Sequence, residues 1–125
     1  SSWLHTIASL RWLSSLRHSA FERERAAAAA DGKLMILKIY QPRCKACRAM
    51  GRKLEVLAQR RPQHRHFEVD AKSPGGRSVV AAVGQPMPTA LPAVLIFDKG
   101  ECVFTKPVPV RLFPELLKVL DTYDK

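Results

Sequence analysis

Hydrophobic and polar positions follow two different periods along this chain of 125 residues. In residues 1–30 apolar side chains recur every three or four positions among Arg, His and Ser, which predicts a basic amphipathic helix. Residues 34–40 are apolar except for Lys38, and such a run is typical of a central strand that is buried on both faces. We therefore expect a helical extension over residues 1–32 and a main domain over residues 33–125.

The main domain mixes the two periods. The apolar positions between residue 44 and Pro62 lie on one helical face, and Pro114 opens a second amphipathic helix. A short helix is expected at residues 77–83, after a loop at residues 73–76. Strands are expected at residues 34–40, 66–70, 93–97 and 102–106, the last two joined by a hairpin turn. The order helix, β, α, β, α, β, β, α indicates an α/β fold.

Positive charge is concentrated in the middle of the chain. The sequence has 21 Lys and Arg residues against 11 Asp and Glu residues, and eight of the cations fall between residues 43 and 65, where Glu55 is the single acid. Such a field favours acidic protein partners, anionic lipid head groups or nucleic acid, although a solvated helix face explains it equally simply. Aromatic residues are few and no nucleic-acid-binding signature accompanies the cations, which argues against a nucleic-acid module.

The first 30 residues leave three interpretations open. A basic, acid-poor amphipathic start suits the end of an organellar transit peptide, a helix lying on a membrane surface, or a helix that docks on a partner subunit, which we place first. Because the first residue is Ser1 rather than Met, we expect a processed precursor. No apolar run approaches the roughly 18 residues of a membrane span, so membrane contact is expected to be peripheral at most.

Candidate chemistry lies at Cys44-Lys45-Ala46-Cys47, where the apolar strand runs into a helix. The first turn of a helix brings two cysteines at this spacing close enough to form a small, reversible disulfide. The unpaired N–H groups and the positive end of the helix dipole favour an anion at the first cysteine. Cys44 is therefore the expected nucleophile, and Cys47 the expected resolving thiol.

The remaining metal-ligating residues do not complete a zinc site. Four ligands are needed, and Cys102, His64 and His66 form no second pair at finger-like spacing, so we expect neither a metal nor an organic cofactor. The two histidines flank a cation ahead of a strand and are expected to be exposed to solvent.

In these features the chain resembles the thioredoxin family over about residues 33–123. The resemblance rests on the strand that leads into Cys44 and Cys47, on residues 91–101, and on the closing amphipathic helix. It implies a thioredoxin-like fold, with a central mixed four-stranded sheet flanked by helices and here an extra N-terminal helix. In that family the proline at the position of Pro92 is cis and faces the dithiol, and the residue before it offers its backbone to the substrate. We accordingly expect Leu91, Pro92, Arg43 and Lys45 to contact substrate.

Several residues depart from the family pattern. Where strong reductases have Trp-Cys-Gly-Pro-Cys, this chain places Arg43 and Lys45 around Cys44, which is expected to stabilise the thiolate and make the disulfide more oxidising. The buried carboxylate usual six residues before the first cysteine is replaced by Lys38, a cation that tunes the site but cannot accept a proton. Arg52 stands near the usual helix proline, and the usual glycine after the fourth strand is replaced around Val108.

Two functions follow from these residues. The first is a dithiol–disulfide oxidoreductase that acts on protein disulfides, with a partner that carries a disulfide or an acidic surface. The second is a catalytically weak accessory or structural subunit of a large photosynthetic or respiratory membrane complex, docked through the N-terminal helix. The Cys-Lys-Ala-Cys-Arg turn resembles divergent thioredoxin-like proteins of algal and protist organelles. This implies an organelle, the chloroplast ahead of the mitochondrion, with the protein soluble or peripheral to a membrane.

Overall fold

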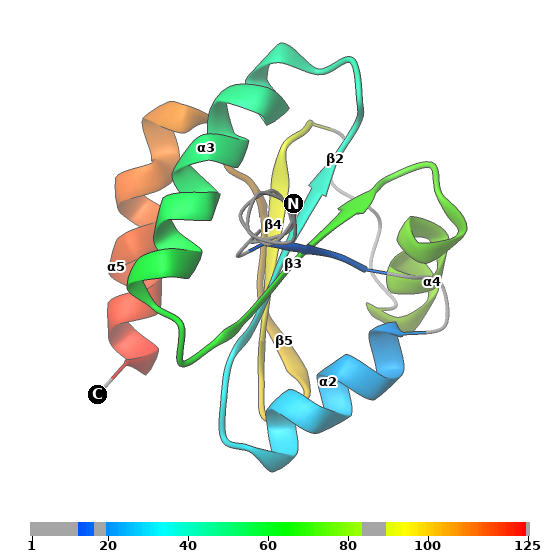
Figure 1. Ribbon diagram of the computed structural model, residues 1–125, viewed down its shortest axis with the longest axis vertical. Coiled ribbons are helices and arrows are strands. Elements are labelled where there is room, and N and C mark those ends of the chain that lie inside the picture. Colours follow the sequence, from blue (N-terminus) through cyan, green and yellow to red (C-terminus); the bar gives the residue numbers. More distant parts are fainter. Residues whose placement is uncertain (1–12, 17–19, 84–89, 125) are drawn as a thin grey trace, which may run out of the picture.

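The computed structural model describes residues 13–16, 20–83 and 90–124, and a mixed sheet forms its middle layer (Figure 1). The strands lie in the order β1-β3-β2-β4-β5; β1, β3 and β2 are parallel, whereas β4 is antiparallel to β2 and β5 to β4. Their bounds are β1 Ser14–Ser15, β2 Met35–Tyr40, β3 Arg65–Asp70, β4 Ala93–Asp98 and β5 Glu101–Pro107. The helices are α2 Phe21–Ala30, α3 Lys45–Arg60, α4 Pro74–Val83 and α5 Phe113–Tyr123, with a 3-10 turn η1 at Val110–Leu112.

Two hydrophobic cores cover the two faces of the sheet. Because successive strand residues point to opposite faces, Leu37 and Ile39 of β2 pack with α2 and α4, while Ile36 packs with α3 and α5. Figure 1 shows α3 and α5 together on one side of the sheet and α2 and α4 on the other. The prediction of a central strand buried on both faces is confirmed. No helix in the described part of the chain is both long and apolar enough to span a bilayer.

The start of the chain differs from the expected continuous helix. Ser14 and Ser15 form a fifth strand beside β3, so the sheet has five strands rather than four, and the helix in this segment covers Phe21–Ala30. Leu13 and Leu16 are three residues apart, which in a helix would place them on one face; here they flank β1 and enter the α3–α5 core and the α2–α4 core respectively. The parts of the expected helix at residues 1–12 and 17–19 lie outside the described residues.

Residues 13–16 and 20–32 share the cores of the rest of the chain. Phe21 of α2 is 1% exposed, and its ring meets the ring of Phe97 in β4 edge-on at 5.4 Å between centroids. Leu16, Ala20 and Ala28 belong to the same core. The described part of the expected extension therefore contributes to the stability of the sheet.

This packing predicts a large effect for Phe21→Ala. Removing a fully buried aromatic ring is expected to lower the free energy of unfolding by about 3–5 kcal/mol, as measured by urea denaturation. Val103→Ala, at a valine of β5 that is 39% exposed, serves as the control and should cost well under ~1 kcal/mol. Equal small losses in both variants would contradict the packing of α2 against β4.

The loop expected at residues 73–76 is instead the first turn of α4. The Ser73 hydroxyl accepts a hydrogen bond from the backbone N–H of Gly76 at 3.1 Å, which satisfies one of the free donors at the helix start. A Cβ atom on Gly76 would lie 2.3 Å from the Asp70 carbonyl oxygen, so the close approach of α4 to the end of β3 requires glycine there. Glycine in this stretch marks a close contact rather than a loop.

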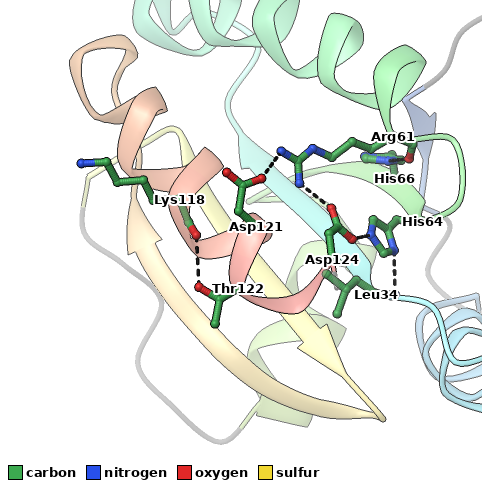
Figure 2. Close-up of polar contacts among 8 residues, drawn as sticks. All are labelled: Leu34, Arg61, His64, His66, Lys118, Asp121, Thr122 and Asp124. Atoms are coloured by element: carbon green, nitrogen blue, oxygen red, sulfur yellow. Dashed lines mark hydrogen bonds and ion pairs between the residues drawn. The ribbon is translucent and has the colours of Figure 1, made fainter.

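The two histidines expected at the surface are largely buried (Figure 2). The His64 side chain is 8% exposed; its Nδ1 accepts a hydrogen bond from the Leu34 backbone N–H at 3.1 Å and its Nε2 contacts the Asp124 carboxylate. His66 is 7% exposed, and burial lowers its pKa below the ordinary value. The prediction of exposure is therefore wrong, because His64 is held between the Leu34 backbone and Asp124 and the His66 ring lies against the Arg61 carbonyl oxygen, 2.9 Å from its Nε2.

Arg61 joins the ends of α3 and α5 beside these histidines. Its guanidinium donates to Asp121 at 2.6 Å and to Asp124, as Figure 2 shows. Burial raises the pKa of Asp124, but the hydrogen bonds from His64 and Arg61 outweigh that effect, so the pKa lies below its ordinary value. The cluster anchors the last helix to the end of the helix that carries the dithiol.

Candidate redox site

The turn between β2 and α3 places one cysteine at the surface and the other inside. Cys44 is the N-cap of α3 and has an extended backbone, with φ −90° and ψ 113°; its Sγ accepts a hydrogen bond from the Cys47 backbone N–H at 3.1 Å. Cys44 is partly exposed, whereas Cys47, in the first turn, is 2% exposed. Both are free thiols in this structure. The spacing thus presents one sulfur to a partner and keeps the second behind it.

The second part of the site comes from the start of β4. The Leu91–Pro92 peptide bond is cis, as expected, and the Cys44 thiol lies 3.9 Å from the Leu91 carbonyl oxygen. Pro92 is buried, and its carbonyl oxygen accepts a hydrogen bond at 2.8 Å from the backbone N–H of Val108, at the end of β5. Cys44 and Leu91, which are 47 positions apart in the sequence, are therefore neighbours at the dithiol.

The cations around Cys44 are at the surface. Arg43 and Lys45 are both exposed, and neither forms an ion pair within residues 13–16, 20–83 and 90–124. Arg43 also lines an open hollow of about 310 Å³ with Gln41, Pro42, Asp70 and Lys72. Both charges are thus available to an approaching molecule. Arg52 lies two turns further along α3 and lines a different surface.

Lys38 has a partner that the sequence pattern did not identify. It pairs in register with Glu68 of β3, and its ammonium lies 3.4 Å from the Glu68 carboxylate; each residue is 6% exposed. The ammonium also lies 5.0 Å from the centre of the Tyr40 ring, and a Cβ atom on Gly51 of α3 would come within 2.9 Å of it. Gly51 therefore leaves the room that the cation occupies under α3.

This ion pair faces the buried cysteine. Lys38, Glu68, Tyr40 and Cys47 all line one cavity of about 150 Å³, which is large enough to hold water. Burial, followed by the hydrogen bond to Cys44, raises the pKa of Cys47 to about 11, although the Lys38 charge acts in the opposite direction. Cys47 is therefore a thiol at neutral pH and needs a base before it can attack, and the carboxylate on this cavity is that of Glu68.

One signal in the sequence points to Glu68. A Lys in a strand buried on both faces requires an opposite charge nearby, and in β3 Glu68 alternates with Phe67 and Val69, so it faces the side opposite to these two apolar residues. The sequence alone does not reveal that β2 and β3 pair in the register that places Glu68 beside Lys38.

The raised pKa of Cys47 can be tested in Cys44→Ala. Burial remains in this variant while the hydrogen bond and the charge of Cys44 are removed, so the midpoint of Cys47 alkylation by iodoacetamide is expected below about 11 and above 9.0. In the unmodified chain the folded state holds the Cys47 proton more tightly than the unfolded state does. This difference stabilises the fold below pH 9.0, and the stabilisation is lost as the pH rises through about 11. A midpoint equal to that of the urea-unfolded chain would contradict the burial of Cys47.

No cluster of three or more His, Cys, Asp or Glu side chains that could hold a metal ion occurs in the described ranges. The third cysteine is remote from the dithiol in sequence: Cys102 of β5 is partly buried, with its Sγ 2.9 Å from the Thr105 hydroxyl oxygen.

Several thioredoxins of known structure match this chain in fold. Thioredoxin f from spinach chloroplast matches with a TM-score of 0.74 at 18% identity, over 90% of this chain and 94% of that one. The chain has the thioredoxin fold. A chain of the complex of ferredoxin:thioredoxin reductase with thioredoxin f2 matches at 0.71 and 15% identity, over 90% and 96% of the two chains. Thioredoxin O2 from Arabidopsis thaliana, in the oxidized state, matches at 0.70 and 16%, over 88% and 95%.

No protein-family model and no curated protein matches the chain. The extent of the thioredoxin fold also corrects the expected range of the resemblance. Residues 33–125 are 93 of the 125 residues, so a match over 90% of the chain must include part of the segment before residue 33. This agrees with the packing of β1 and α2 into the two cores.

Proposed function

We propose that the protein is a dithiol–disulfide oxidoreductase that acts on disulfides of other proteins. The observation that carries this proposal is the position of Cys44: a partly exposed sulfur at the start of α3, 3.9 Å from the Leu91 carbonyl oxygen, with a buried thiol one turn behind it. The hydrogen bond from the Cys47 backbone N–H and the helix N-terminus both favour an anionic sulfur at Cys44. Leu91, Pro92, Arg43 and Lys45 surround the place where a partner disulfide would lie.

The reaction runs in two exchange steps. The Cys44 thiolate attacks one sulfur of the partner disulfide; that S–S bond breaks, a mixed disulfide forms, and the other partner sulfur leaves as a thiolate. Cys47 then loses its proton and attacks the Cys44 sulfur, so that the partner's second sulfur leaves. The two electrons of the dithiol end on the two partner thiols, and Cys44 and Cys47 are left as a disulfide. A further dithiol is needed to reduce it.

We assign the proton acceptor of the second step to Glu68. Burial raises the pKa of the Cys47 thiol, and Cys47 lines the same cavity as the Glu68 carboxylate, so water in this cavity can pass the proton between them. The Lys38 ammonium lies 3.4 Å from this carboxylate and is its ion-pair partner. In this assignment Lys38 affects the site through its ion pair with Glu68 and does not itself accept a proton.

A trapping experiment tests the proposed reaction. In Cys47→Ser the first step is retained and the second is blocked, so incubation with insulin is expected to give a stable mixed disulfide on Cys44, seen as a mass increase that dithiothreitol removes. The double variant Cys44→Ser/Cys47→Ser should give none. Adducts of equal amount in both variants would place the reactive sulfur at Cys102 and refute the assignment of Cys44.

The expected partner is a protein with a disulfide and an acidic surface near it, because Arg43 and Lys45 present exposed positive charge beside Cys44. Ferredoxin:thioredoxin reductase is the partner in one solved complex of this fold, and a reductant of that class would regenerate the dithiol. We also propose an organellar compartment, the chloroplast before the mitochondrion, supported by the spinach chloroplast protein of the same fold. Imaging the protein fused at its C-terminus to a fluorescent protein, expressed from its own gene, tests this compartment.

The accessory-subunit role is a second proposal. It is favoured by Lys38, which stands where the thioredoxin resemblance implies a carboxylate, and by the high positive charge of the chain. A subunit of this kind would hold the dithiol without turning it over. Absence of any trapped adduct in Cys47→Ser would favour this role over the oxidoreductase.

A further inference from the structure

A second surface hollow lies between α3 and α5, away from the dithiol. The two helices run side by side on the same face of the sheet (Figure 1), and a groove of about 350 Å³ separates their outer surfaces. We call it the α3–α5 groove. It is lined by Arg52, Lys53, Val56, Leu57, Arg60, Phe113 and Leu117. Its volume is at the lower end of the range of about 300–1,000 Å³ that binding pockets occupy.

The floor of the groove is apolar and partly open to solvent. Val56 is 45% exposed, the largest exposure among the large hydrophobic side chains of the described residues. Phe113 and Leu117 of α5 are only partly buried, whereas Leu57 is buried beneath them. An exposed valine next to an aromatic ring in a concavity is a feature of surfaces that bind apolar side chains.

All three charged residues that line the groove are cations. Arg52, Lys53 and Arg60 form no ion pair with the part of the chain that the structure describes. The Lys53 ammonium lies 5.5 Å from the centre of the Phe113 ring, which holds this charge over the apolar floor. The groove therefore combines an apolar floor with positive charges that form no ion pair among the described residues.

We propose that the α3–α5 groove binds an acidic amphipathic helix of a partner protein. Its apolar residues would fill the floor at Val56, Phe113 and Leu117, and its carboxylates would pair with Arg52, Lys53 and Arg60. Charge complementarity selects this occupant: a second copy of the same groove would bring like charges together. A membrane surface fits less well, because binding to a bilayer needs apolar side chains that project outward, whereas these line a hollow.

This site is separate from the redox chemistry. Val56 is twelve residues after Cys44, which corresponds to roughly 18 Å along the axis of α3. A partner held in the groove would leave the sulfur of Cys44 accessible to other proteins. This partner would contact α3, the helix that carries the dithiol. The proposal does not depend on the oxidoreductase function, since binding would persist in a variant without the nucleophile.

The test uses a synthetic probe and the full chain. The probe is a fluorescein-labelled 18-residue peptide with Leu at helical i, i+3, i+4 spacing and Glu on both flanks, and binding is followed by fluorescence anisotropy at low salt. Val56→Lys and Arg60→Glu are each expected to raise the Kd at least about tenfold. Cys44→Ser should bind as the unmodified chain does.

Two control variants carry the same kinds of substitution, Val→Lys and Arg→Glu, outside the groove. Val103→Lys replaces another exposed valine, on β5, and Arg77→Glu reverses an exposed cation on α4; both should change the Kd by less than about twofold. The proposal is overturned if the acidic peptide does not bind, if a peptide with Lys in place of Glu binds equally well, or if the control variants weaken binding as much. It is also overturned if phosphatidylglycerol vesicles bind the chain in a Val56-dependent manner while the peptide does not.

Discussion

Cys44→Ser is expected to abolish the reduction of insulin disulfides, with a loss in kcat/KM of at least about a thousandfold. A serine hydroxyl at the start of α3 keeps the hydrogen bond from the Cys47 backbone N–H, but it cannot form the mixed disulfide through which the electrons pass. The assay follows precipitation of the reduced insulin chains with dithiothreitol as the electron source. The full chain is required, since Leu13 contributes to one core and Leu16, Phe21 and Ala28 to the other.

Cys102→Ser is the matched control for this loss. Cys102 is the third cysteine of the chain, is partly buried on β5 and contacts the Thr105 hydroxyl group rather than the dithiol. This variant should retain the rate of the unmodified chain. A Cys44→Ser variant that is as active as Cys102→Ser would remove the oxidoreductase proposal and leave the accessory role.

Glu68→Gln is expected to slow release of the mixed disulfide by about a hundredfold at neutral pH, because the Cys47 thiol loses its proposed proton acceptor. The same change leaves the buried Lys38 ammonium without its carboxylate, so the free energy of unfolding should fall by about 3–5 kcal/mol. The release rate is measured by stopped-flow from a preformed mixed disulfide between Cys44 and a fluorescent peptide, under conditions where the variant is folded.

The pH dependence separates a proton acceptor from a structural role. As the pH rises toward the pKa of Cys47, which burial holds above its ordinary value, Cys47 ionises without a base, so the release rate of Glu68→Gln should rise toward that of the unmodified chain. The exchanged pair Lys38→Glu/Glu68→Lys keeps both charges in the cavity and should recover most of the stability and of the rate. A release rate for Glu68→Gln that is unchanged at neutral pH would exclude Glu68 from the proton path.

The site can still contain a base although the cation Lys38 stands where a carboxylate is usual. The thioredoxin resemblance implies a carboxylate at this position, and a cation there leaves no base in the sequence neighbourhood of the dithiol. Across the sheet, the register between β2 and β3 places Glu68 opposite Lys38 and on the cavity of Cys47. A carboxylate is thus present, on the neighbouring strand.

Local features of the chain were predictable because they depend on neighbours in the sequence. The apolar run at β2 determines a doubly buried strand, and Pro62 follows directly after the C-cap of α3 at Arg61. The hairpin between β4 and β5 follows from its turn residues, where Lys99 and Gly100 have φ values of 53° and 84°. The expected continuous helix at the start of the chain is wrong because the spacing of Leu13 and Leu16 is ambiguous. Three residues apart, they could share one face of a helix or, in an extended segment, point into the cores on opposite faces of the sheet.

By itself, the sequence determined the order of most strands and helices, the spacing of the two cysteines at a helix start, and the excess of positive charge, since each depends on residues close together in the chain. Only the tertiary structure decided which distant residues meet. It brought Leu91 to Cys44, Glu68 to Lys38 and Cys47, and Asp124 to His64. These contacts arise from strand register and from the packing of helices on a shared sheet, and neither is contained in the local pattern of any one segment.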